Sequence, residues 1–126
     1  GYVFLLDDDD FIVNPEMIQQ LKAVSFIEDS PDIIFFRMTI KNGQNNNHYP
    51  TDELCWGKEP IIARIGGSCM VVRTEWYKKY AHHFGVARCG DFYFLKAMWN
   101  DVPKVYWHDS LMAETGSVGR GKPEIK

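Results

Sequence analysis

The chain has 126 residues, which suits one small domain with a single hydrophobic core and is too short for two ordinary domains. Hydrophobic residues make up 45% of it and aromatic residues 14%, enough apolar surface to offset the entropy of folding and to exclude a disordered chain. The formal net charge of −3 gives no long-range attraction for nucleic acid or anionic lipid, so neither is an expected partner.

Three cysteines, Cys55, Cys69 and Cys89, are odd in number and far apart, and they form no C-x-x-C pair that would hold zinc. This spacing favours reduced, buried thiols in an intracellular compartment over a disulfide framework. No apolar run approaches the length of a membrane span. We therefore expect a cytoplasmic domain without a membrane span in this segment. A peripheral position of the full-length protein at the inner face of the membrane stays open.

The first part of the chain has the pattern of a strand, a helix and a second strand. Tyr2 to Leu6 is a continuous apolar run that four acids stop, which is typical of a central strand buried on both faces of an α/β sheet. Asn14 and Pro15 suit the cap and the first position of a helix that ends near Glu28. Ile33 to Ile40 is rich in β-branched and aromatic residues and predicts the second strand, which would complete a βαβ unit.

The rest of the chain has shorter elements. Lys41 to Lys58 is polar and predicts a long surface loop. The sequence then predicts a strand over Cys69 to Arg73 and a helix that begins at Thr74. Residues 1–126 thus predict a single α/β domain or a fragment of one, with a mixed sheet flanked by helices. The last expected elements are a helix over Phe92 to Trp99, a short strand over Val105 to His108 and a flexible tail over residues 112–126.

Four acids follow the first apolar run, and packing cannot account for them at the end of a buried strand, where α/β sheets bind ligands. Asp7 and Asp9 are two residues apart, so in extended chain their carboxylates point the same way and can converge on one Mg²⁺ or Mn²⁺ ion. The alternative is a solvated acidic turn in which Asp10 or Asn14 caps the next helix. The acids alone leave both interpretations open.

The stretch from Tyr2 to Leu21, YVFLLDDDDFIVNPEMIQQL, resembles the strand, DxD motif and proline-led helix of family-2 glycosyltransferases, whose catalytic domain has the Rossmann-like GT-A fold. The resemblance runs from Tyr2 to about His108 and is most diagnostic in this first stretch. It implies a partial GT-A domain that transfers a sugar from a nucleotide-diphosphate sugar to a hydroxyl of a saccharide or glycoconjugate, as in polysaccharide biosynthesis. It also implies that Asp9 ligates the metal on the diphosphate, with Asp7 near the ribose and the metal's water shell.

The resemblance continues on the side of the acceptor substrate. The stretch from Gly66 to Arg73 is similar to the acceptor-side strand of the family. It implies that Gly66, Gly67 and Ser68 contact the acceptor, and paired glycines permit such a close backbone approach.

Cys89 to Leu95 is similar to the segment in which the family places two acids at the start of a helix. Gly90 stands where the first acid is usual, so the resemblance leaves Asp91 as the catalytic base. An acceptor hydroxyl is a poor nucleophile until a carboxylate accepts its proton, and a single displacement of this kind inverts the anomeric configuration. The alternative is that Asp91 only caps the helix that begins at Phe92.

Further side chains are weaker candidates. His108 closes the last predicted strand and is a candidate third metal ligand, because some GT-A enzymes have a histidine there; the alternative is a structural histidine. Arg120 lies in the glycine-rich tail and could fold over a diphosphate, or be solvated. Trp56 could stack on sugar, whereas Trp76 and Trp99 are expected in the core.

A complete GT-A domain has a nucleotide-binding half before the DxD strand, and this sequence begins at that strand. We therefore expect these 126 residues alone to be inactive as a transferase. Two other functions stay open. One is a magnesium-dependent phosphatase of the haloacid-dehalogenase kind, which also has a DxD after a strand. The other is a non-catalytic domain that binds carbohydrate or a protein partner.

Overall fold

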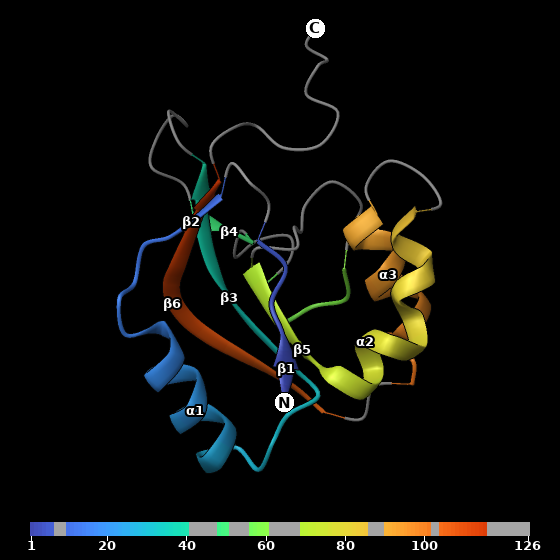
Figure 1. Ribbon diagram of the computed structural model, residues 1–126, viewed down its shortest axis with the longest axis horizontal. Helices are drawn as coiled ribbons and strands as arrows, with labels where there is room; N and C mark the ends of the chain where they lie inside the picture. Colours follow the sequence, from blue (N-terminus) through green and yellow to red (C-terminus); the bar gives the residue numbers. More distant parts are fainter. Residues whose placement is uncertain are drawn as a thin grey trace, which may run out of the picture.

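The computed structural model describes residues 1–6, 10–40, 48–50, 56–60, 69–85, 90–101 and 104–115. These residues form a mixed sheet with helices on both of its faces (Figure 1). The strands are β1 (Tyr2–Val3), β2 (Asp10–Ile12), β3 (Ile33–Ile40), β4 (His48–Tyr49), β5 (Met70–Arg73) and β6 (Val105–Thr115). The helices are α1 (Met17–Ile27), α2 (Thr74–Tyr80), the 3-10 helix η3 (Ala81–Gly85) and α3 (Gly90–Met98).

The sheet has the strand order β1-β5-β3-β6-β2, and β4 pairs with β3 beside this path. β3 and β6 are parallel, and all the other pairs are antiparallel. Because β1 and β3 both run opposite to β5, the strands β1, β3 and β6 share one direction. The last residues of β3 and β6 lie at one edge of the sheet, which we call the carboxyl edge, and their first residues lie at the opposite amino edge. β1 lies at the amino edge, because Val3 pairs with Val72, which pairs with Ile33 at the start of β3. The prediction of an α/β chain with a mixed sheet flanked by helices is confirmed.

The prediction of a central first strand is wrong. β1 comprises only Tyr2 and Val3, and it is one of the two outer strands in the strand order of the described sheet. The apolar run is nevertheless explained by burial, because side chains pack on both faces of this segment. Tyr2 and Phe4 lie against the cluster under α1, whereas Val3 and Leu5 line a small hollow on the face that α2 and α3 cover. β1 runs in the same direction as β3, as a βαβ unit requires, but β5 lies between them.

Two apolar clusters hold the helices on the sheet. Under α1 the core consists of buried side chains from α1, β3, β5 and β6, among them Met17, Phe36 and Met112. On the other face, Phe94 of α3 and its neighbours pack on Phe35 and further residues of β3 and β5. Trp76 and Trp99 pack against this second cluster, as predicted.

Helix α1 begins at Met17, three residues after the expected cap. The side-chain Oδ1 of Asn14 accepts a hydrogen bond of 2.9 Å from the backbone N–H of Glu16, so Asn14 forms a turn before the helix and does not cap it. Within the polar stretch from 41 to 58, His48 and Tyr49 add the short strand β4 to β3.

Strand β6 is much longer than the four residues predicted. It runs over 11 residues to Thr115 and follows β3 in parallel, with register shifts on either side of Arg37. The polar residues Asp109 and Ser110 hid this continuity in the sequence, because they break the apolar run. The prediction of a flexible tail from residue 112 is therefore wrong for residues 112–115, which lie in β6 with Met112 and Ala113 fully buried. Residues 116–126 lie outside the described ranges. Among the described helices, none is long and apolar enough to cross a membrane.

Candidate functional site

The acidic segment precedes β2, which begins at the carboxyl edge of the sheet. β2 begins there with Asp10, which pairs with Thr115 at the end of β6, whereas β1 ends with Val3 at the amino edge. These strand ends flank the acidic segment, although Asp7 and Asp9 themselves lie outside the described residues. The carboxyl ends of strands in α/β sheets are the usual place for ligands. The start of β2 thus lies where ligands usually bind, and the metal role of Asp7 and Asp9 stays a prediction.

Helix α3 begins on the side of the molecule toward the carboxyl edge. α2 follows β5 at the amino edge, where the indole Nε1 of Trp76 donates to Asp32. The chain returns through α3 to the amino edge, where Lys104 precedes β6 and its backbone N–H also donates to Asp32. Figure 1 shows the first turn of α3, in light orange, in the half of the molecule in which β3 and β6 end. Asp91 lies in this first turn and is half-buried.

Position 90, where the resemblance would place an acid, has no room for a side chain. A Cβ atom at this position would lie 2.4 Å from the backbone oxygen of Phe84 in η3, much closer than real atoms approach. The ring of Phe84 stacks on Phe94 of α3 with centroids 4.4 Å apart, which fixes η3 against α3. Position 90 therefore accepts no side chain in this packing, and Asp91 is the carboxylate in the first turn of α3.

His108 does not have the position expected of it. It is the fourth residue of the long strand β6, not the end of a short one, and it faces α1. Its Nε2 lies 3.3 Å from Oε1 of Gln20, which also accepts a hydrogen bond of 3.4 Å from the hydroxyl of Ser110. Burial lowers the pKa of His108, and the nearby charge of Asp109 opposes this effect. The premise for a third metal ligand, a histidine at the end of the last strand, is therefore wrong.

The remaining predicted site residues fall outside the described ranges. They are Asp7, Asp9, Gly66, Gly67, Ser68 and Arg120. Within the described ranges, no group of three or more His, Cys, Asp or Glu side chains is arranged to hold a metal ion. Their roles as metal, acceptor and diphosphate contacts stay predictions.

A buried arginine on the α3 face of the sheet was not predicted. Arg37 of β3 is only 6% exposed. Its Nε donates a hydrogen bond of 2.8 Å to Oδ1 of Asp109, its guanidinium carbon lies 3.6 Å from the ring centroid of Trp56, and it also donates to the carbonyl oxygen of Pro50. The one signal in the sequence is a charged residue in the middle of the most apolar strand. Its partners, 13 to 72 residues away, carry no pattern that would pair them with it.

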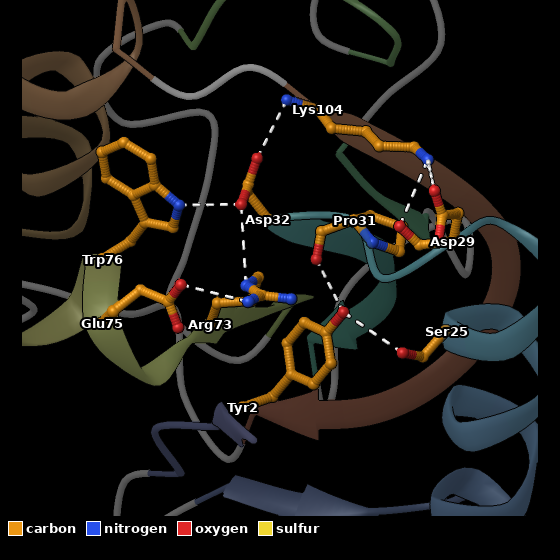
Figure 2. Close-up of polar contacts among 9 residues, drawn as sticks. All are labelled: Tyr2, Ser25, Asp29, Pro31, Asp32, Arg73, Glu75, Trp76 and Lys104. Carbon is orange, nitrogen blue, oxygen red and sulfur yellow. Dashed lines mark hydrogen bonds and ion pairs between the residues drawn. The ribbon is translucent and has the colours of Figure 1, made fainter.

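A second polar cluster lies at the amino edge and is structural (Figure 2). The carboxylate of Asp32 accepts hydrogen bonds from Trp76 Nε1 at 2.8 Å and from the backbone N–H of Lys104 at 3.1 Å. Nε of Arg73 lies 3.7 Å from the same carboxylate, and the side chain of Arg73 pairs with Glu75, which lowers the pKa of Glu75. These contacts join the ends of β3, β5 and β6 to α2.

Comparisons of the chain with protein-family models, with curated proteins and with solved structures find no match. The functional interpretation therefore depends on the DxD resemblance and on the geometry of the carboxyl edge.

Proposed function

We propose that the chain is the metal-binding and acceptor-activating part of a glycosyltransferase that transfers a sugar from a nucleotide-diphosphate sugar to a hydroxyl acceptor. The observation that best supports the proposal is that β2 begins at the edge where β3 and β6 end, with the start of α3 on the same side of the molecule. Residues 7–9 precede β2, which begins at the carboxyl edge, residues 66–68 precede β5, and Asp91 lies in the first turn of α3. We expect these three segments, which are distant in sequence, to meet at this edge.

The metal role is proposed for Asp7 and Asp9. They offer carboxylate oxygens, the ligands that Mg²⁺ and Mn²⁺ prefer, and a nucleoside diphosphate offers further oxygens. When bound, the ion would neutralise the negative charge that develops on the leaving diphosphate. Arg120 stays a predicted contact of the same diphosphate.

The base role is proposed for Asp91. Its carboxylate accepts the proton of the acceptor hydroxyl while the hydroxyl oxygen forms a bond to the anomeric carbon of the donor sugar. The bond from that carbon to the diphosphate oxygen breaks, and the diphosphate leaves with the electron pair. Attack from the face opposite to the leaving group inverts the anomeric configuration.

Calorimetry on the full-length protein with manganese and a nucleoside diphosphate tests the metal role. Asp9→Ala should abolish metal-dependent binding, because it removes the proposed direct ligand. Asp29→Ala is a matched control, since Asp29 is a 97% exposed acid at the amino edge, and its binding should equal that of the parent. Unchanged binding in Asp9→Ala would contradict the proposal. A phosphoenzyme trapped by a phosphate analogue would favour the phosphatase alternative.

Turnover of the same protein tests the base role. Asp91→Asn keeps the size of the side chain and much of its capping ability, so the variant should fold and bind nucleotide and manganese as the parent does. Because the amide cannot accept the proton, turnover should fall about a hundredfold or more. Turnover close to that of the parent would show that Asp91 is not the base.

A further inference from the structure

On the α3 face of the sheet, the buried guanidinium of Arg37 contacts the exposed Asp109 and the half-buried Trp56. The side chain of Asp109 is 71% exposed, whereas that of Arg37, which binds it, is only 7% exposed. The guanidinium carbon of Arg37 also lies over the half-buried indole of Trp56, 3.6 Å from its ring centroid. Burying a guanidinium in an apolar strand costs free energy unless hydrogen-bond acceptors pair with it. Arg37 is therefore expected to hold Asp109 and Trp56 in fixed positions.

The indole of Trp56 is held from a second side as well. Its ring lies 5.0 Å from that of Trp107, at an interplanar angle of 64°, and Trp107 is itself stacked on Phe35 at 4.1 Å. Phe35 and Trp107 belong to the cluster that α3 packs on. Trp56 is therefore fixed by side chains of β3 and β6, and a ligand that contacts it would meet a preorganised aromatic surface.

The charges around this indole favour a neutral ligand with hydroxyl groups. The hydrogen bond from Arg37 lowers the pKa of Asp109, and the charge of His48 acts in the same direction, so this carboxylate stays an acceptor for O–H donors. An exposed carboxylate repels phosphate and carboxylate ligands. A sugar ring has an apolar C–H face, which fits an indole, and hydroxyl groups at its rim, which fit a carboxylate and an imidazole.

We infer that Trp56, Asp109 and His48 form a saccharide-binding subsite, with Arg37 as its positioning residue. β4, which carries His48, pairs with Met38 and Thr39 in the half of β3 nearer the carboxyl edge. The subsite thus lies on the same face of the sheet as α3 and toward the carboxyl edge. We assign the acceptor of the proposed transfer to this subsite, an assignment that rests on the proposed function. The acceptor would then be a saccharide.

Saturation-transfer NMR and calorimetry on the full-length protein, without metal or nucleotide, test this inference. The probes are maltotetraose, cellotetraose and chitotetraose, each measured alone. At least one should bind, with transfer to its ring C–H protons, and Trp56→Ala should weaken that binding about tenfold or more. Asp109→Asn should weaken it several-fold, while Trp76→Phe, a control at the amino edge, should leave it unchanged.

Circular dichroism identifies variants that fail to fold, and the exposed Asp109→Asn keeps the test valid if Trp56→Ala is one of them. Binding of no probe, or equal binding in the parent and in a folded Asp109→Asn, would overturn the subsite. Manganese-dependent nucleotide binding is measured separately. If saccharide binds as expected and nucleotide does not, the subsite is supported and its role for a transferase acceptor is overturned.

Discussion

The carboxylate of Asp32 offers the sharpest test of what holds the sheet together. It is 12% exposed and accepts hydrogen bonds from Trp76 Nε1 and from the backbone N–H of Lys104, through different oxygens. Asp32→Asn keeps one oxygen and replaces the other by an NH₂ group, which must face one of these two donors. The variant therefore loses one hydrogen bond to a charged acceptor and also the charge beside Arg73.

The expected loss in the free energy of unfolding is about 2 kcal/mol, since a hydrogen bond to a charged group contributes about 1.5–3 kcal/mol. For a domain of this size, the loss corresponds to a decrease of about 8 °C in melting temperature. Urea unfolding followed by circular dichroism measures the loss. Asp29→Asn is the control and should change stability by less than about 0.5 kcal/mol, because Asp29 is an exposed acid 3.9 Å from Lys104. If Asp32→Asn also stays within 0.5 kcal/mol of the parent, the reasoning on the Asp32 contacts is refuted.

Gly90→Ala should lower the free energy of unfolding by about 1–3 kcal/mol despite the better helix propensity of alanine, because its Cβ would meet the Phe84 backbone oxygen at 2.4 Å. Urea unfolding checks this, and a stabilised variant would show that η3 gives way easily. Burial lowers the pKa of His108 in the folded chain. As the pH falls below 6.5, the unfolded chain therefore takes up a proton at His108 before the folded chain does, and the folded chain loses stability. His108→Gln should therefore lose less stability than the parent between pH 7.5 and 5, while manganese-dependent nucleotide binding stays unchanged; parallel pH profiles of the two proteins would disprove this account.

Local patterns in the sequence predicted elements better than their neighbours in space. The run from Ile33 to Ile40 predicted β3 to the residue, because its β-branched and aromatic side chains suit a strand buried on both faces. The apolar run after Tyr2 showed that both faces of the first strand are covered, but composition does not show how many strands flank it. β6 was predicted too short because Asp109 is satisfied by Arg37, a partner 72 residues away that no local pattern reveals.

The candidate site shows the same limit. The resemblance singled out Asp91, and the structure describes it at the start of a helix on the side of the molecule toward the carboxyl edge, whereas the steric reason for Gly90 needed the position of Phe84. His108 was misplaced because its assignment depended on where a strand ends. Arg37 was overlooked because a single charge in an apolar run has no spacing that marks a site.

The contacts of Asp32 have a consequence for how this domain can diversify. They bind the strand ends at the amino edge to one another and to α2, on the opposite side of the molecule from the start of α3. Segments that join the strands at the carboxyl edge can therefore change in length and composition while the strand ends at the amino edge stay bound together. Grafting such segments from another protein onto this sheet should leave the melting temperature nearly constant.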